Sequence, residues 1–257
     1  MPDFRALHRP GDPLLLPNAW DVASALALAH AGFAAIGTTS LGVAAAHGLP
    51  DGQAKGKEQT LSFVRALHGR LRVPLTVDLE GGFGGTPDEV AELAATLHAA
   101  GAAGINLEDA RPGGTLAGPA EQAAIVAAVK ERCPDLFVNA RTDTFWSGTK
   151  DLDETRARVA TYLDAGADGI FVPAIEKDDD IRALVATKAK APLNVLLLPG
   201  MTVGHLAGLG VARISTGSLL FRAALSAAVA TVREVAAGAP ARAAATSYAE
   251  ANALSAD

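Results

Sequence analysis

The sequence predicts an α/β protein, a single-domain (β/α)₈ TIM-type barrel, on three observations. Eight short apolar runs alternate with eight longer segments in which apolar residues recur with helical period. The apolar runs are nearly continuous, as is typical of parallel strands buried on both faces. The chain has 257 residues, a usual length for one barrel. We therefore expect residues 1–238 to form one catalytic barrel domain.

The expected elements follow the chain in strict alternation. The expected strands lie at 14–16, 34–37, 75–77, 104–107, 136–139, 169–172, 193–196 and 212–214. The expected helices lie at 21–31, 57–69, 88–100, 119–132, 152–165, 178–189, 202–209 and 217–236. Thr86 before Pro87 is a helix start signal, and glycines at Gly32, Gly101 and Gly166 mark helix ends. The alanine-rich segment 239–257 is expected to be a helical tail, either an outer helix of the barrel or a subunit contact.

An open, doubly wound sheet is the alternative architecture. Its phosphate-binding fingerprint G-x-G-x-x-G is missing, because Pro87 takes the place of the third glycine in the stretch that begins at Gly82. No P-loop sequence is present either. The closed barrel is therefore the preferred prediction.

Composition excludes several classes of partner. The net charge is −6 and no Lys/Arg block interrupts it, so we expect no nucleic-acid binding. No apolar run approaches the roughly 18 residues of a membrane span, and the first residues lack the apolar core of a signal peptide. The one cysteine, Cys133, is expected to be a buried structural thiol. We expect a cytoplasmic protein whose ligand is a small molecule.

Polar side chains follow several expected strands, and in a barrel all strand ends meet on one rim. The acids and the arginine at these ends are Asp78, Glu80, Glu108, Asp109, Arg141 and Asp143. Carboxylates without His or Cys partners favour Mg²⁺, with Mn²⁺ as an alternative, over zinc. Asp78 and Glu80 occupy alternate positions of an extended strand end, so both can point to one side. Arg141 can bind a carboxylate through two parallel hydrogen bonds.

Each of these residues also has a structural interpretation. An acid at a strand end is often a helix N-cap, and this is the preferred interpretation of Asp109 and Asp143. For Asp78 and Glu80 the glycine-rich stretch 81–85 favours a functional role, because glycine lets the backbone approach a ligand closely. The alternative interpretation of Arg141 is a structural role, in which it forms an ion pair with a carboxylate of the rim.

Five motifs, each at an expected strand end, resemble those of the isocitrate lyase / phosphoenolpyruvate mutase superfamily. They are Asn18-Ala19-Trp20-Asp21, Thr39-Ser40-Leu41-Gly42 followed by Gly48-Leu49-Pro50-Asp51-Gly52, Asp78-Leu79-Glu80-Gly81-Gly82-Phe83-Gly84, Gly104-Ile105-Asn106-Leu107-Glu108-Asp109, and Asn139-Ala140-Arg141-Thr142-Asp143. The resemblance implies a Mg²⁺-dependent enzyme that cleaves a bond of a small 2-oxo or 2-hydroxy acid and leaves a pyruvate-type enolate. It also implies a homo-oligomer, either a dimer or a tetramer.

The resemblance assigns roles to individual residues of this chain. Asp78 matches the direct metal ligand, and Glu80 and Glu108 match acids that hold the water molecules of the metal. Asp51 matches a further acid of that outer layer. The site residues for the substrate are Thr39, Ser40, Leu41 and Arg141, and we expect Arg141 and Glu108 to be the catalytic pair. His47 lies between Ser40 and Asp51 in sequence, so we assign it an outer position near the site.

Departures from the superfamily motifs bear on the reaction. The lyases of the superfamily carry a catalytic cysteine in the loop after the fourth strand, whereas the loop 110–118 of this chain has no Cys or His. The mutase lysine and histidine are also missing, and Pro173 takes the place of the histidine. We therefore expect C–C cleavage that needs no cysteine, such as oxaloacetate decarboxylation. The alternatives are P–C bond chemistry like that of phosphoenolpyruvate mutase or phosphonopyruvate hydrolase, and a non-catalytic carboxylate-binding barrel. Gly113 and Gly114 are candidate hinges of a lid.

Overall fold

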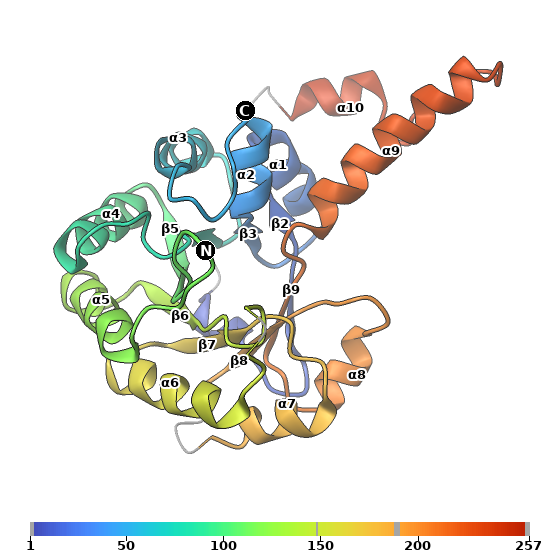
Figure 1. Cartoon of the computed structure of the whole chain (residues 1–257). Coiled ribbons are helices and arrows are strands. Elements are labelled where there is room, and N and C mark those ends of the chain that lie inside the picture. The colour runs from blue at the N-terminus through green and yellow to red at the C-terminus, as the bar shows by residue number, and fades with distance from the viewer. Residues whose placement is uncertain (1–2, 148, 188–190, 255–257) are drawn as a thin grey trace.

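The computed structural model describes residues 3–147, 149–187 and 191–254 and confirms the barrel (Figure 1). All neighbouring strands pair in parallel, in the order β1-β9-β8-β7-β6-β5-β4-β3-β2. The strands are β1 (Leu14–Leu16), β2 (Asn18–Ala19), β3 (Ile36–Thr38), β4 (Leu75–Asp78), β5 (Ala102–Glu108), β6 (Phe137–Arg141), β7 (Gly169–Val172), β8 (Leu193–Leu196) and β9 (Arg213–Ser215). Only Pro17 separates β1 from β2, so the two ends of this order are one chain segment and the sheet closes on itself.

Helices surround the strands, and most begin and end within a few residues of the predicted positions. They are the 3₁₀-helix η1 (Arg5–Leu7) and the α-helices α1 (Val22–His30), α2 (Ser40–Ala46), α3 (Lys57–Leu67), α4 (Pro87–Ala99), α5 (Pro119–Arg132), α6 (Leu152–Asp164), α7 (Asp178–Val185), α8 (Val203–Gly208), α9 (Leu219–Ala236) and α10 (Tyr248–Ala253). Helix α2 was not predicted, because a short helix directly after a strand has a hydrophobic pattern too short to distinguish from that of a loop. Residues 188 and 189 of the expected helix 178–189 lie outside the described residues.

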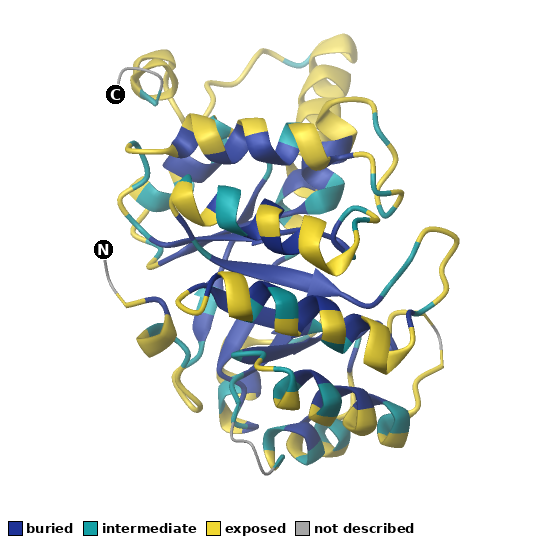
Figure 2. Cartoon of the chain, turned by 90° about the vertical axis from the view of Figure 1, so that its left-hand side faces the viewer, coloured by how far each residue is buried: buried dark blue, intermediate teal, exposed yellow. Residues whose placement is uncertain are grey.

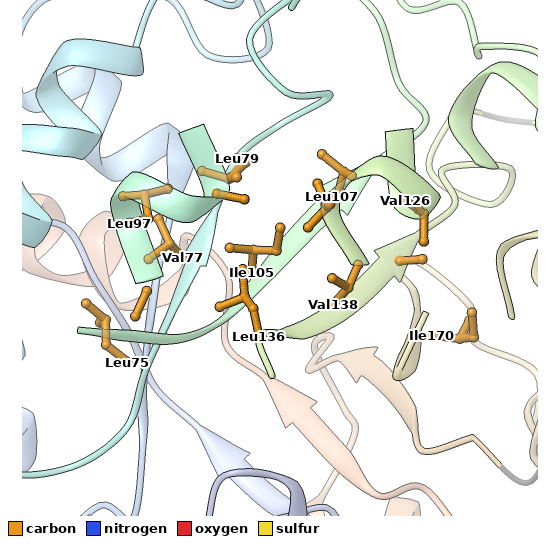
Figure 3. Packing of buried hydrophobic residues seen from close by; sticks show 14 of the residues in the cluster. Leu75, Val77, Leu79, Leu97, Ile105, Leu107, Val126, Leu136, Val138 and Ile170 are labelled. Atoms are coloured by element: carbon orange, nitrogen blue, oxygen red, sulfur yellow. The ribbon is translucent and has the colours of Figure 1, made fainter. Parts of the chain in front are cut away.

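The apolar core lies between the barrel and the helices α1 to α8, which are buried on their inner faces and exposed on their outer faces (Figure 2). Val77 and Ile105 point outward from β4 and β5 into this layer, where Leu97 of α4 and Val126 of α5 belong to the same cluster (Figure 3). Alternate strand residues must therefore point into the barrel, and several of these are polar. Thr76, Asn106, Asn139, Asn194 and Arg213 are buried polar residues on the strands.

The N-terminal segment closes the bottom of the barrel with aromatic rings. The ring of His8 stacks on Phe137 with centroids 4.4 Å apart, and Phe4 packs edge-on against both rings. Burial lowers the pKa of His8 to about 4, and the charge of Arg213 acts in the same direction. His8 is therefore neutral in the folded protein at neutral pH.

Acid is expected to destabilise the protein through His8. The folded pKa of about 4 lies below the ordinary value of 6.5, so the unfolded state binds the proton more readily. The stability that neutral His8 contributes is complete above pH 6.5 and is lost as the pH falls toward 4. We expect the free energy of unfolding of the wild type, relative to His8→Gln, to fall by up to about 3 kcal/mol across this range. Urea denaturation of both proteins between pH 4 and 7 measures it, and a pH-independent difference would contradict this role of His8.

The C-terminal helices leave the barrel. Figure 1 shows α9 extending away from the body of the molecule, and Phe221 is the one residue of α9 that is buried. The chain then returns through α10, and Nη2 of Arg70 donates a hydrogen bond to the carbonyl of Leu254 at 2.8 Å. Residues 255–257 of the expected tail lie outside the described residues. In the described ranges, every helix is too short or too polar to span a bilayer.

Candidate active site

A cavity of about 490 Å³ opens at the carboxyl ends of the strands and is lined by residues from most of them. Asp78 at the end of β4 and Arg141 at the end of β6 line this same cavity. The cavity size is within the range of small-molecule sites. The residues that the sequence analysis placed on the rim and that line it are Thr39, Ser40, Leu41, Asp51, Asp78, Glu108, Arg141 and Asp143.

The segment Thr39-Ser40-Leu41 forms the N-terminal cap and first turn of α2. Thr39 has an extended backbone and its hydroxyl accepts a hydrogen bond from the backbone of Gly42 at 3.5 Å, which starts the helix. This places the backbone N–H of Ser40 3.3 Å from Oδ2 of Asp78. The start of α2 is thereby fixed against the acid at the end of β4.

Asp78 has one oxygen held and one oxygen free. Its backbone N–H donates to the Thr38 hydroxyl at 2.8 Å, and its Oδ2 accepts from Ser40. Its Oδ1 is buried and has no hydrogen-bond partner among residues 3–147, 149–187 and 191–254. A buried carboxylate oxygen without a partner is costly, and a cation would satisfy it.

Glu80 reaches the site by a route that the sequence did not indicate. The strand ends at Asp78, and Glu80 lies in the following turn with a φ of 50°, a conformation that favours glycine. Strand alternation is therefore the wrong reason for its position. Its Oε2 accepts a hydrogen bond from the backbone of Ala54 at 3.0 Å. Burial raises the pKa of Glu80 to about 7, and the charges of Asp78 and Asp51 contribute to the shift.

The glycines after Glu80 serve packing and do not line the cavity, which corrects the expectation that they approach a ligand. A Cβ on Gly81 would lie 2.7 Å from the carbonyl oxygen of Ala110 and from a guanidinium nitrogen of Arg111. A Cβ on Gly82, whose φ is 84°, would lie 2.5 Å from Val90. Glycine is thus needed where this turn contacts the loop after β5 and helix α4.

Arg141 is fixed by two carboxylates. Its Nε and Nη2 donate to the two oxygens of Asp143 at 2.6 and 2.8 Å, and its Nη1 lies 2.8 Å from Oε2 of Glu108. The guanidinium also lies over the ring of Phe171, 5.5 Å from its centroid. Burial opposes the charge, but Glu108 and Asp143 outweigh it and raise the pKa of Arg141. A guanidinium has further N–H donors, which leaves donors for a ligand in the cavity.

The acids of the site fit a hard cation. Burial raises the pKa of Glu108, although Arg141 opposes the shift, and the charges of Asp78 and Glu80 act in the same direction as burial. Such mutual repulsion of buried carboxylates is relieved by a bound cation. In the described ranges no three His, Cys, Asp or Glu side chains are close enough to hold an ion directly. This arrangement suits Mg²⁺, which usually binds one or two carboxylates and keeps several waters.

Of the two residues expected in the outer layer of the metal site, Asp51 and His47, the structure places only Asp51 at the cavity. Asp51 lines the cavity; burial raises its pKa, the charge of Asp78 adds to the shift, and a hydrogen bond with the Ser40 side chain opposes it. His47 is exposed at the end of α2, and its Nδ1 contacts the carbonyl of Val43 at 2.8 Å. The structure does not bring His47 to the cavity.

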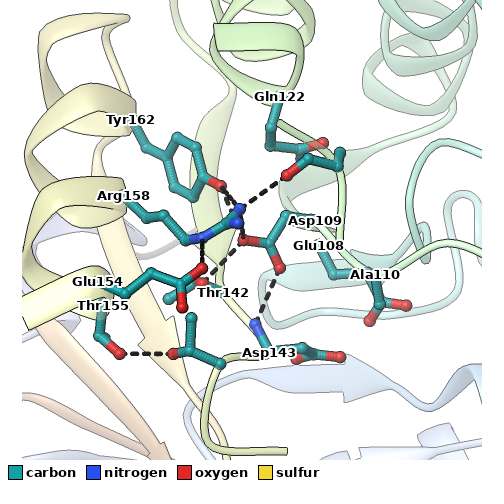
Figure 4. Close-up of polar contacts among 12 residues, drawn as sticks. Glu108, Asp109, Ala110, Gln122, Thr142, Asp143, Glu154, Thr155, Arg158 and Tyr162 are labelled. Carbon is teal, nitrogen blue, oxygen red and sulfur yellow. Dashed lines mark hydrogen bonds and ion pairs between the residues drawn. The ribbon is translucent and has the colours of Figure 1, made fainter. Parts of the chain in front are cut away.

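Asp109 and Asp143 are not helix N-caps, because Gly118 and Asp151 precede α5 and α6. Asp143 pairs with Arg141. Asp109 is completely buried and joins β5, β6 and α6 (Figure 4). Its two carboxylate oxygens accept hydrogen bonds from the Thr142 hydroxyl, the backbone N–H of Asp143, Nη1 of Arg158 and the Tyr162 hydroxyl, at 2.7 to 3.1 Å. The network holds the chain directly after Arg141.

Loss of this buried acid is expected to destabilise the fold. Asp109→Ala removes the buried carboxylate partner of Arg158 and leaves the Thr142 and Tyr162 hydroxyls without their acceptor, which should lower the free energy of unfolding by about 3–5 kcal/mol. The matched control is Glu154→Gln, which removes the partly exposed partner of the same arginine and should cost about 0–1 kcal/mol. Equal losses in urea denaturation would contradict the structural role of Asp109.

Several residues at the site escaped the sequence analysis. Phe171 and Leu196 line the cavity from β7 and β8, and Trp146 lines its mouth with 57% of its surface exposed. Phe171 and Leu196 stand at or near strand ends, so their position on the rim was predictable, although apolar side chains gave no chemical signal. Cys133 is buried, as expected.

Comparisons with known proteins agree on one family. The sequence profile of the family described as phosphoenolpyruvate phosphomutase matches residues 4–236. Uncharacterized protein Rv1998c of Mycobacterium tuberculosis is 44% identical over 91% of this chain and 89% of its own. A 2-methylisocitrate lyase of Bacillus subtilis is 33% identical over 74% of this chain and 64% of its own. A crystal structure of phosphonopyruvate hydrolase in complex with oxalate and Mg²⁺ has a TM-score of 0.86 at 26% identity and covers 99% of this chain and 94% of that one.

Proposed function

Because this chain belongs to the phosphoenolpyruvate mutase/isocitrate lyase superfamily, we propose that it is a Mg²⁺-dependent carbon–carbon lyase of small 2-oxo or 2-hydroxy carboxylates. The reaction would pass through a pyruvate-type enolate, and oxaloacetate decarboxylation is the specific reaction proposed. The observation that carries the proposal is the gathering of Asp78 and Glu108 beside Arg141 at one cavity, with the charge of Glu80 close enough to raise the pKa of Glu108.

The site residues would have separate roles in binding the cation and the substrate. Asp78, with its free Oδ1, would hold the cation directly, and Glu80 and Glu108 would hold its water molecules. The bound cation would supply polarisation of the substrate carbonyl. The turn Thr39-Ser40-Leu41 would hold the substrate carboxylate and carbonyl oxygen.

Arg141 would stabilise the negative charge that develops on the enolate oxygen. Glu108 and Asp143 already fix its guanidinium, so little reorganisation is needed during the reaction. In the decarboxylation, the C3–C4 bond breaks, CO₂ leaves, and the bonding electron pair enters the enolate, which becomes pyruvate by taking one proton from solvent at C3 after the loop 110–118 opens. No cysteine is required for this step. Arg111, Gly113 and Gly114 line the cavity from the loop 110–118, which we propose excludes water from the enolate.

The proposal is tested with a panel of 2-oxo and 2-hydroxy acids, assayed with Mg²⁺ and with a chelator. We expect turnover of at least one C4 acid to pyruvate only when Mg²⁺ is present. Binding of oxalate with Mg²⁺ but no turnover of any acid would instead identify a non-catalytic carboxylate-binding barrel. Turnover that survives chelation would contradict the proposed metal dependence.

Cleavage of a P–C bond is the second candidate. It is favoured by the likeness to phosphonopyruvate hydrolase, whose structure holds oxalate and Mg²⁺. Against it, the cavity has Pro173 where the mutase motif has a histidine. Phosphorus NMR of phosphonopyruvate incubated with the protein and Mg²⁺ separates the two candidates, because release of phosphate would identify P–C cleavage.

We further propose that the enzyme is a cytoplasmic homo-oligomer, a dimer or tetramer, assembled through α9. The helix exposes a stripe of apolar side chains, namely Leu225, Val229, Val232 and Val235. A second copy of the chain would bury them. Sedimentation of the wild type should show an oligomer, and Val229→Asp should dissociate it. A monomeric wild type would contradict this assembly.

A further inference from the structure

Arg213 is a buried cation inside the barrel. It lies on β9, has 0% of its surface exposed, and its Nη2 donates to Oδ1 of Asn106 at 3.1 Å. Because Asn106 lies on β5, which does not neighbour β9 in the sheet, both side chains must point into the barrel. Its Nε lies 3.4 Å from the Ser215 hydroxyl, and its Nη1 has no hydrogen-bond partner in the described part of the chain.

The hydrogen-bond partners of Arg213 are polar but carry no charge. Asn106 also accepts from Nδ2 of Asn139 at 2.9 Å, and Ser215 donates to Oδ1 of Asn194 at 3.0 Å. Among residues 3–147, 149–187 and 191–254, Arg213 forms no ion pair. A buried charge without a partner normally destabilises the folded state. Burial lowers the pKa of Arg213 to about 9, while the charge of Asp78 opposes the shift, so the guanidinium is protonated at neutral pH.

The two contacts of Arg213 place it directly below the candidate active site. Asn106 and Ser215 both line the cavity, and Asp78 stands on the same strand face one layer above Thr76. A charge in this low-dielectric interior acts over several ångströms. It must attract an anion in the cavity and repel a cation there.

We propose that Arg213 is a positioning residue that holds the cavity floor through Asn106 and Ser215 and biases the site toward anionic ligands. This inference rests on the proposed function, in which the cavity takes Mg²⁺ and an anionic oxo acid. Arg213 would then weaken Mg²⁺ binding to the free protein and strengthen the binding of the acid. The site would load its cation mainly together with the substrate.

The proposal predicts shifts of opposite sign for two ligands. Arg213→Met removes the charge and keeps much of the apolar volume, so Mg²⁺ alone should bind on the order of tenfold more tightly. Oxalate at saturating Mg²⁺ should bind on the order of tenfold more weakly. Arg213→Lys keeps the charge and loses the planar fork, so both affinities should stay closer to those of the wild type.

Titration calorimetry with Mg²⁺ alone and then with oxalate tests this, and thermal denaturation reports folding. If Arg213 has only a structural role, Arg213→Met should bind both Mg²⁺ and oxalate more weakly than the wild type does, and that result would overturn the proposal. Arg213→Gln is a second uncharged variant. If neither uncharged variant folds while Arg213→Lys does, the charge serves stability and the proposal is also overturned. If the wild type binds no Mg²⁺, the proposed function itself fails.

Discussion

Asp78→Asn is expected to lower kcat/KM by about 10³-fold or more, because it removes the charge from a site carboxylate whose Oδ1 is buried and has no hydrogen-bond partner in the described part of the chain. The backbone N–H of Ser40 donates a hydrogen bond to Oδ2 of Asp78, and an asparagine oxygen can accept the same bond. The asparagine side chain should therefore keep the position of the aspartate. The loss should therefore reflect cation binding and not a displaced strand. Steady-state kinetics and Mg²⁺ calorimetry on the same preparation measure both effects.

The matched control for this variant is Asp179→Asn. Asp179 is an exposed acid on α7 whose contact is a surface pair with Arg182. This variant should keep the kcat/KM of the wild type and its affinity for Mg²⁺ in calorimetry. If Asp78→Asn also binds Mg²⁺ with wild-type affinity, Asp78 is not the direct ligand.

Arg141→Lys is expected to lower kcat by about 10²–10³-fold, the usual cost of losing an oxyanion donor. The charge remains, but a lysine cannot make the fork to Asp143 and the contact to Glu108 while also facing the cavity. The effect should appear mainly in kcat, because the interaction is strongest in the transition state.

Arg132→Lys is the control, since Arg132 forms only an exposed pair with Glu92 in the described part of the chain. It should retain wild-type kcat and KM. An Arg141→Lys enzyme that loses affinity for substrate but keeps kcat would show that Arg141 serves ground-state binding alone.

The barrel was predictable because its strands are buried on both faces and its helices are punctuated by caps and glycines. The rim was predictable for the same reason, since parallel strands in a barrel deliver their ends to one side. Asp78 and Arg141 were identified in this way, and the structure brings both to one cavity. The resemblance, which the family match confirms, supplied the roles that the residue types alone left open.

Tertiary contacts decided what the sequence could not. Asp109 was predicted to be a helix N-cap. The prediction was wrong because its partners Arg158 and Tyr162 lie about 50 residues away on a helix, and the sequence around Asp109 gives no sign of these contacts. Glu80 reached the site through a left-handed turn and not through strand alternation. Arg213 was missed because an arginine in a short apolar run gives no sign of whether it points into the barrel or into solvent.

The most direct test of the account is a crystal of the protein soaked with Mn²⁺ and oxalate, measured at a wavelength where manganese scatters anomalously. We expect one strong anomalous peak in contact with the Asp78 carboxylate, with oxalate between this ion and the guanidinium of Arg141. A peak away from Asp78, or oxalate bound in the cavity with no ion beside it, would contradict the account.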